Sequence, residues 1–136
     1  MESADEPEVR AIFAECYPNR PVYPAMWYVA HPTLVAVDDD NGEEILGFLS
    51  FSIDMNNVMV LWDIALRASA RGQGIGKKIF EEYLMIGRSL GYTFFGTVAP
   101  DNHPMVKLLT SHGFHACQRS HDNRIIYVNA GDPHAV

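Results

Sequence analysis

Two hydrophobic periods alternate along the chain and divide it into helices and strands. Apolar residues three or four positions apart favour a helix, whereas alternation or a short apolar run between turn residues favours a strand. On this basis the sequence predicts helices over Glu8–Tyr17, from Gly76 to Leu90, and from Pro100 to a stop at Gly113. The predicted strands are Thr33–Val37, Ile45–Ile53, Val58–Leu66, Tyr92–Val98, Phe114–Arg119 and Arg124–Val128.

The order of these elements predicts the fold class. One helix is followed by three strands, a long helix, a strand, a helix and a hairpin. Short, turn-rich links favour antiparallel pairing of the first three strands, while the long helix forms the crossover that a parallel pair needs. We therefore expect an α/β (α+β mixed) protein with a central, mainly antiparallel sheet, helices on both faces and one parallel strand pair.

Length and composition narrow the class of protein. A chain of 136 residues, 48% of them apolar, is typical of one domain, so 1–136 are expected to form a single domain with a tail at 131–136. Cys16 and Cys117 are far apart, and the acidic start does not resemble a secretion signal, which predicts reduced thiols and a cytoplasmic protein. The longest apolar stretch is far below the roughly 20 residues of a membrane span, so we expect no membrane partner.

Charge is distributed unevenly along the chain. The formal net charge is −7, and residues 1–63 contain 12 acidic and 2 basic side chains, against 5 and 8 in residues 64–136. A chain without a basic stripe is poorly suited to nucleic acid, which we exclude as a partner. Between Arg67 and Lys78, however, four basic side chains occur without an acid. This segment is where an anionic small ligand would be expected.

A glycine-rich turn, Arg71-Gly72-Gln73-Gly74-Ile75-Gly76, connects a strand to the long helix. Glycines let the backbone approach a ligand, and N–H groups at a helix start bind anions. The turn fits neither of two familiar phosphate motifs. Lys78 stands where a Walker loop has Ser or Thr, and Lys77 stands where the dinucleotide fingerprint has Gly, which disfavours a kinase or phosphatase. A tight strand-to-helix connection without a ligand is the alternative.

The pattern Arg71-x-x-Gly74-x-Gly76, between a strand and an amphipathic helix, resembles the acetyl-CoA pyrophosphate motif of the GCN5-related N-acetyltransferase (GNAT) superfamily. The segment Asn102–Phe114 is similar to that family's Asn-x-x-Ala-x-x-Leu-Tyr-x-x-x-Gly-Phe sequence. The positions in register are Asn102, Leu108, Gly113 and Phe114. The resemblance covers about residues 33–128, and the N-terminus looks shortened because the family's usual first strand has no counterpart before Glu8.

The resemblance implies acetyl-CoA as co-substrate and indicates where it would bind. The backbone of Leu66, Arg67 and Ala68 would bind the pantetheine arm, and Asn102 would contact the cofactor. The pyrophosphate would lie on the backbone amides of Arg71, Gly72, Gln73, Gly74, Ile75, Gly76 and Lys77. The N–H near Leu66 would stabilise the oxyanion, and the strand that ends there would separate from the Tyr92–Val98 strand.

The sequence supplies the catalytic groups only in part. Acetyl transfer needs a neutral amine and a group that protonates the leaving thiolate. Asp63 resembles the acidic residue with which many members hold or deprotonate the acceptor; the alternative is a structural carboxylate that caps a turn or pairs with a base such as Arg20. The tyrosine that often serves as acid is replaced by Leu109, and the glutamate that sometimes serves as base is replaced by Thr97.

Other polar residues are candidate substitutes for the missing acid. Ser111, His112 and Tyr83 are the ones that we consider. His112, at the end of a predicted helix, is a catalytic candidate, with helix capping as the alternative. The three histidines His112, His115 and His121 lack the spacing of a zinc site, so no metal is expected.

Aromatic residues of the Pro-rich segment are candidates for the acceptor site. Tyr23, Trp27 and Tyr28, together with Tyr17, lie where this superfamily usually forms the wall of the acceptor pocket; ordinary core packing is the alternative. Aromatic rings in an acidic half suit a cationic acceptor such as a polyamine, an amino sugar or a protein amine. Two functions remain open for a monomer or homodimer: an N-acetyltransferase using direct attack in a ternary complex, or a non-enzymatic CoA-binding or protein-interaction module.

Overall fold

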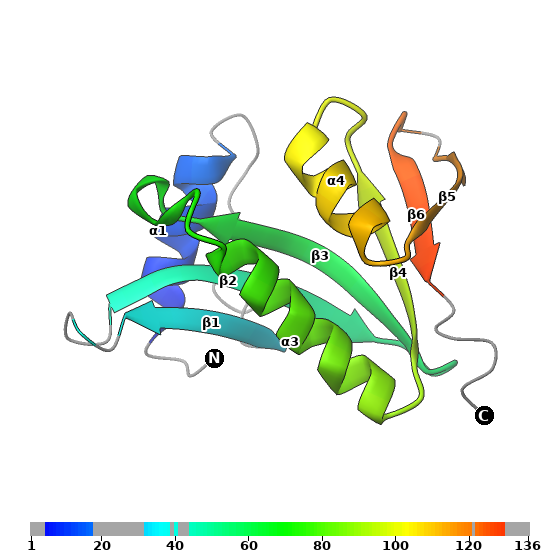
Figure 1. The fold of residues 1–136 in the computed structure, drawn as a ribbon, viewed down its shortest axis with the longest axis horizontal. Coiled ribbons are helices and arrows are strands. Elements are labelled where there is room, and N and C mark those ends of the chain that lie inside the picture. The colour runs from blue at the N-terminus through cyan, green and yellow to red at the C-terminus, as the bar shows by residue number, and fades with distance from the viewer. Residues whose placement is uncertain (1–4, 18–31, 39, 41–43, 121, 130–136) are drawn as a thin grey trace. The chain divides into compact units, whose positions relative to one another are not determined.

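The structure is a computed structural model that describes residues 5–17, 32–38, 40, 44–120 and 122–129. Its helices are α1 (Glu6–Cys16), the 3-10 turn η3 (Ala68–Ala70), α3 (Ile75–Ser89) and α4 (His103–Ser111). Its strands are β1 (Thr33–Asp38), β2 (Glu44–Ile53), β3 (Val58–Leu66), β4 (Thr93–Val98), β5 (His115–Arg119) and β6 (Ile125–Asn129). The predicted helices and strands are all present (Figure 1). The turn η3 was not predicted, because one turn is too short to show a period.

The six strands form one sheet in the order β1-β2-β3-β4-β6-β5. β1 pairs antiparallel with β2, β6 pairs antiparallel with both β4 and β5, and β3 pairs parallel with β4. This order confirms the mixed α/β fold with a mainly antiparallel sheet and one parallel pair across α3. The parallel ladder joins Val58–Leu61 to Thr93–Gly96, whereas β3 continues to Leu66. The paired residues therefore end before Leu66, the residue where the family resemblance implies that the two strands separate.

Element boundaries follow from local chemistry. α1 begins at Glu6, two residues before the predicted start, because Pro7 fits the first turn of a helix. α4 begins after Asn102, whose side-chain Oδ1 accepts a hydrogen bond from the N–H of Met105 at 3.4 Å. Among the described residues, no helix is both long and apolar enough to cross a membrane.

The chain divides into two compact units, and one of them contains residues 1–51 and 63–83. The single domain over 1–136 stays a prediction. In this first unit, the apolar face of α1 packs on one face of the sheet: Val9, Ile12, Phe13, Ile45, Phe48 and Ala65 form a buried cluster. On the opposite face, Phe51 contacts the ring of Tyr83 on α3, with centroids 5.2 Å apart. Figure 1 accordingly shows α1 behind β1 and β2 and α3 in front of them.

A bulge in β2 allows Ile45 and Phe48 to face the same side. The β1–β2 register changes from Ala36↔Gly47 to Val37↔Ile45, so Leu46 is an extra residue in β2. A bulge breaks the alternation of side chains, and here it returns Ile45 to the α1 face. It also turns the carbonyls of Ile45 and Leu46 toward the end of β3, where both accept hydrogen bonds from Arg67.

The second unit contains residues 52–62 and 84–136. Phe94 of β4 lies against Phe114, with ring centroids 6.0 Å apart, and both are buried with Leu109 of α4. Gly87 of α3 is in contact with the side chains of Met59 and Phe94, where a Cβ would clash. This unit therefore has its own apolar core, formed from β4, α4 and the end of α3.

A substitution at Gly47 of β2 can test how tightly the end of β3 is packed. A Cβ at this position would clash with the side chain of Leu66 and the carbonyl oxygen of Ala65. We expect Gly47→Ala to lower the free energy of unfolding by about 1–3 kcal/mol, the usual cost of overpacking. The control is Gly96→Ala, because a Cβ there would lie 3.6 Å from Leu61 Cβ, an ordinary contact. Chemical denaturation of the two variants measures the difference, and equal stabilities would contradict this prediction.

Candidate functional site

The glycine turn lies at the N-terminus of α3 and is exposed to solvent. Gly72 and Gly74 have φ angles of +78° and +77°, in the left-handed region that favours glycine. The first N–H groups of a helix have no partner within it and carry a positive partial charge. No acidic residue occurs in the first turn of α3, and Lys77 and Lys78 are exposed there. The backbone conformation and the local charge therefore suit an anion.

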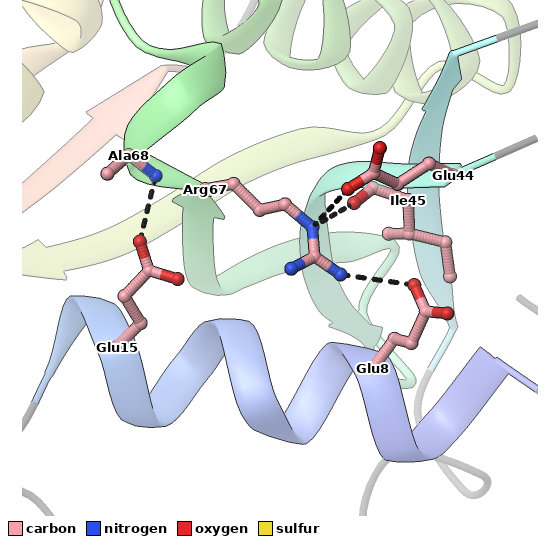
Figure 2. A network of polar contacts seen from close by, with 6 residues as sticks. All are labelled: Glu8, Glu15, Glu44, Ile45, Arg67 and Ala68. Atoms are coloured by element: carbon pink, nitrogen blue, oxygen red, sulfur yellow. Dashed lines mark hydrogen bonds and ion pairs between the residues drawn. The ribbon is translucent and has the colours of Figure 1, made fainter. Parts of the chain in front are cut away.

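The end of β3 is held by Arg67. Its backbone N–H donates to Leu46 O at 2.8 Å, and its side-chain Nε donates to Ile45 O at 2.5 Å. Its Nη2 lies 3.1 Å from Glu8 Oε2, and its Nε lies 3.7 Å from Glu44 Oε1 (Figure 2). The guanidinium is thus directed to α1 and β2. Arg67 contributes little free positive charge to the basic segment that the sequence suggested.

The backbone carbonyl before Arg67 and the backbone N–H after it already have partners. The N–H of Ala68 donates to Glu15 Oε1 at 2.8 Å (Figure 2). Leu66 O accepts hydrogen bonds from Cys16 Sγ at 3.1 Å and from Arg71 Nη2 at 3.3 Å. Because the N–H of Arg67 is turned to β2, the backbone groups of Leu66 point to the opposite edge of the strand. A cofactor arm bound at Leu66 would have to replace these contacts.

We expect Arg67→Met to destabilise the fold, because it removes a charged hydrogen bond to the buried end of β2. The expected loss of unfolding free energy is about 1–2 kcal/mol, chiefly from the bond to Ile45 O. Glu8→Gln, which removes only the partly exposed ion pair, should cost less than about 1 kcal/mol. Thermal melts of both variants measure which one loses more stability, and a larger loss of stability in Glu8→Gln would contradict this prediction.

Asp63 lies in β3 and is buried, with 4% of its surface exposed. Burial of a carboxylate costs free energy unless polar groups replace the lost water, so a carboxylate at this position needs polar partners in the fold. Asp63 and Leu66 are both in the first compact unit, together with the glycine turn. Asp63, the proposed base, and Leu66, whose N–H is the proposed oxyanion donor, are thus three residues apart on one strand. Arg20, its suggested alternative partner, lies outside the described residues.

Asn102 and His112 lie at the two ends of α4, in the second compact unit. Asn102 caps the helix start, and His112 Nδ1 lies 2.8 Å from Leu108 O and 3.2 Å from Ser111 Oγ. These are helix-capping contacts, the alternative that the sequence left open for His112. Cofactor contact by Asn102 and catalysis by His112 stay predictions.

The positions where the family often has acid and base side chains are occupied differently. Leu109 is fully buried, and Thr97 Oγ1 accepts a hydrogen bond from Arg124 Nε at 3.1 Å. Tyr83 is also fully buried, and burial raises the pKa of its phenol well above the usual value. These residues belong to the core and to the support of β4. Tyr83 is therefore excluded as a solvent-accessible proton donor.

Three of the predicted acceptor-site residues, Tyr23, Trp27 and Tyr28, lie outside the described residues, as does the tail at 131–136. Cys16 and Cys117 are both free thiols. No group of three or more metal-binding side chains occurs within the described part of the chain. The structure adds the contacts of Cys16 and Tyr17 with β3 and of Glu15 with Ala68 of η3. No local sequence pattern indicated them, since the paired residues are 47 to 53 positions apart.

The comparison with protein families gives the class of this chain. The model of the acetyltransferase (GNAT) family matches residues 5–114. The chain therefore belongs to this family, whose members are typically acetyl-CoA-dependent N-acetyltransferases. The match includes the glycine turn, β3 and α4.

Solved structures with the same fold come from several bacteria. The ribosomal-protein-S18-alanine N-acetyltransferase of Escherichia coli is 18% identical over 100% of this chain and 95% of its own, with a TM-score of 0.77. An N-acetyltransferase of Staphylococcus aureus Mu50 is 17% identical over 96% of both chains, with a TM-score of 0.80. The putative acetyltransferase yncA of Salmonella typhimurium, solved with its cofactor acetyl-CoA, is 15% identical over 100% of this chain and 94% of its own, with a TM-score of 0.78. At these identities the likeness establishes the fold.

Proposed function

We propose that this chain transfers an acetyl group from acetyl-CoA to a primary amine of a small molecule or a protein. The observation that carries the proposal is the exposed glycine turn at the start of α3, with Gly72 and Gly74 in left-handed conformation and no acidic residue in the first turn. Such a turn is suited to a pyrophosphate. The family match and the acetyl-CoA in the Salmonella structure support this ligand.

The proposed chemistry assigns separate tasks to the residues of the first unit. The amides of the glycine turn bind the pyrophosphate, and the pantetheine arm follows the edge of β3 at Leu66. The neutral amine attacks the thioester carbon, while Asp63 holds the amine or takes its proton. The N–H at Leu66 stabilises the developing oxyanion. The C–S bond then breaks, and CoA leaves as the thiol after it gains a proton.

The acceptor is proposed to be cationic in its resting form. The acidic excess of residues 1–63 favours such a substrate near α1 and β2. A panel should include a polyamine, an amino sugar, a lysine peptide and a peptide that begins with alanine, the last because of the name of the Escherichia coli neighbour. We further propose that the protein is cytoplasmic, acts without nucleic acid, membrane or metal, and is a monomer or homodimer.

Release of free CoA thiol tests the proposal directly. Purified protein is mixed with acetyl-CoA and each amine, and the thiol is followed with a chromogenic disulfide. Amine-dependent release above the rate without protein supports the transferase. Absence of acetyl-CoA binding in calorimetry would overturn it.

A CoA-binding module without turnover is the second candidate. The buried Leu109 and the Thr97–Arg124 contact favour it, because both positions lack the acid or base of many members. This candidate predicts calorimetric binding of acetyl-CoA and no thiol release with any amine. The same assay therefore separates the two functions.

A further inference from the structure

Three consecutive residues at the end of α1 form side-chain hydrogen bonds with every second residue at the end of β3 and the start of η3. The hydroxyl of Tyr17 donates a hydrogen bond to Ile64 O at 3.1 Å, and the thiol of Cys16 donates one to Leu66 O at 3.1 Å. Glu15 Oε1 accepts a hydrogen bond from the N–H of Ala68 at 2.8 Å. Because the N–H of Arg67 pairs with Leu46 of β2, the even-numbered residues present their backbone groups to the other edge. Tyr17 thus reaches the strand edge that the proposed cofactor arm uses.

The direction proposed for the cofactor on this edge would place its reacting end near Tyr17. If the pyrophosphate lies on residues 71–77 and the arm on Leu66, the chain of the cofactor runs back along β3 toward its middle. Ile64 is the next residue with a backbone carbonyl on that edge, roughly 7 Å beyond Leu66 in an extended strand. The thioester end would therefore approach the hydroxyl that is bound to Ile64 O. The ring of Tyr17 is held by Phe13, with centroids 5.1 Å apart.

The other candidate donors are less suited to this step. Leu109 has no acidic proton, Tyr83 is fully buried in the core, and His112 caps the end of α4 in the second compact unit. A phenol ordinarily keeps its proton up to about pH 10, so it can serve as a donor at neutral pH. Tyr17 combines a suitable proton with a position at the edge of β3 that faces away from β2.

We propose that Tyr17 is the catalytic acid of this chain and donates its proton to the sulfur of the leaving CoA. The amine nitrogen forms the new bond to the thioester carbon, and the C–S bond breaks with its electron pair on sulfur. The Tyr17 hydroxyl turns from Ile64 O to that sulfur, and its proton moves to the sulfur. The acylated nitrogen loses a proton to Asp63 or directly to the solvent, and the phenolate regains one from the solvent, so protons and charge balance. This inference rests on the proposed acetyltransferase function.

The variant Tyr17→Phe removes the hydroxyl and keeps the ring against Phe13. We expect kcat to fall roughly 10²-fold, within the usual range for a general acid, while the calorimetric Kd for acetyl-CoA stays within about twofold. Tyr92→Phe, a tyrosine between α3 and β4, serves as the matched control and should keep wild-type kcat. Thermal melts of both variants measure any change in fold stability.

A second variant separates catalysis from structure. Site-specific 3-fluorotyrosine at position 17 lowers the pKa of the phenol with almost no change in shape. Because the acid must be protonated, activity falls as pH rises through its pKa, so the alkaline limb of kcat should move to lower pH. A structural hydroxyl would not move that limb.

The outcomes distinguish this inference from the proposed function. If wild-type protein releases thiol and both Tyr17 variants keep its rate and its alkaline limb, Tyr17 is not the acid, although the transferase stands. If wild-type protein binds no acetyl-CoA, the proposed function fails first. A lower melting temperature of Tyr17→Phe, with an unshifted limb in the fluorotyrosine protein, would also overturn the inference.

Discussion

Gly74→Asp should weaken acetyl-CoA binding at least tenfold. Gly74 has a φ angle of +77°, which other residues adopt only with strain, and its position on the exposed turn leaves open space for a side chain. The aspartate adds a negative charge beside the N–H groups that would bind the pyrophosphate. A tenfold loss corresponds to about 1.4 kcal/mol, which charge repulsion at a phosphate site can supply. Titration calorimetry with acetyl-CoA measures the effect.

Gly91→Asp is the matched control for backbone strain. Gly91 also has positive φ, +72°, and open space around it, but it follows the C-terminal end of α3 instead of its start. Both variants should therefore lose similar stability, whereas only Gly74→Asp should lose affinity. Equal acetyl-CoA affinity in wild type and Gly74→Asp would remove the turn as the pyrophosphate site.

The fold could be predicted largely because its signals are local. Short windows of sequence contain both the 3.6-residue apolar period of α3 and the apolar runs of β2 and β3. The glycine turn was also predictable, since left-handed positions such as Gly72 and Gly74 need glycine. The boundaries moved by one to three residues, as at the start of α1 and at the start of α4, which the cap Asn102 places at His103.

The contacts around the site were not predictable, because they join residues that are distant in the chain. Arg67 reads as a ligand-binding cation in sequence, yet its guanidinium is paired with Glu8, which is 59 residues away. The extra residue Leu46 in β2 has no sequence signature, although it turns two carbonyls toward Arg67. Tyr17 could be named as an aromatic candidate, but its bond to Ile64 O depends on where α1 docks. Tertiary packing determines such pairs.

Asp63→Asn should lower kcat/KM roughly 10²-fold and leave acetyl-CoA affinity nearly unchanged. The carboxylate is buried on β3, three residues before Leu66, where it would hold the amine or accept its proton. Asparagine has nearly the same shape but cannot act as a base. Because a base must be deprotonated, the acidic limb of the wild-type pH profile should be lost in the variant. Steady-state thiol release over a pH series measures both effects.

Asp54→Asn is the control for this substitution, because Asp54 is exposed and its carboxylate accepts backbone hydrogen bonds in the turn before β3. Asparagine can make the same contacts there, so activity should stay at the wild-type level. A lowered melting temperature of Asp63→Asn with normal turnover per folded molecule would make Asp63 a structural carboxylate. If wild-type activity shows no pH dependence where the amine titrates, desolvation of the acceptor would supply the free amine, and no dedicated base would be required.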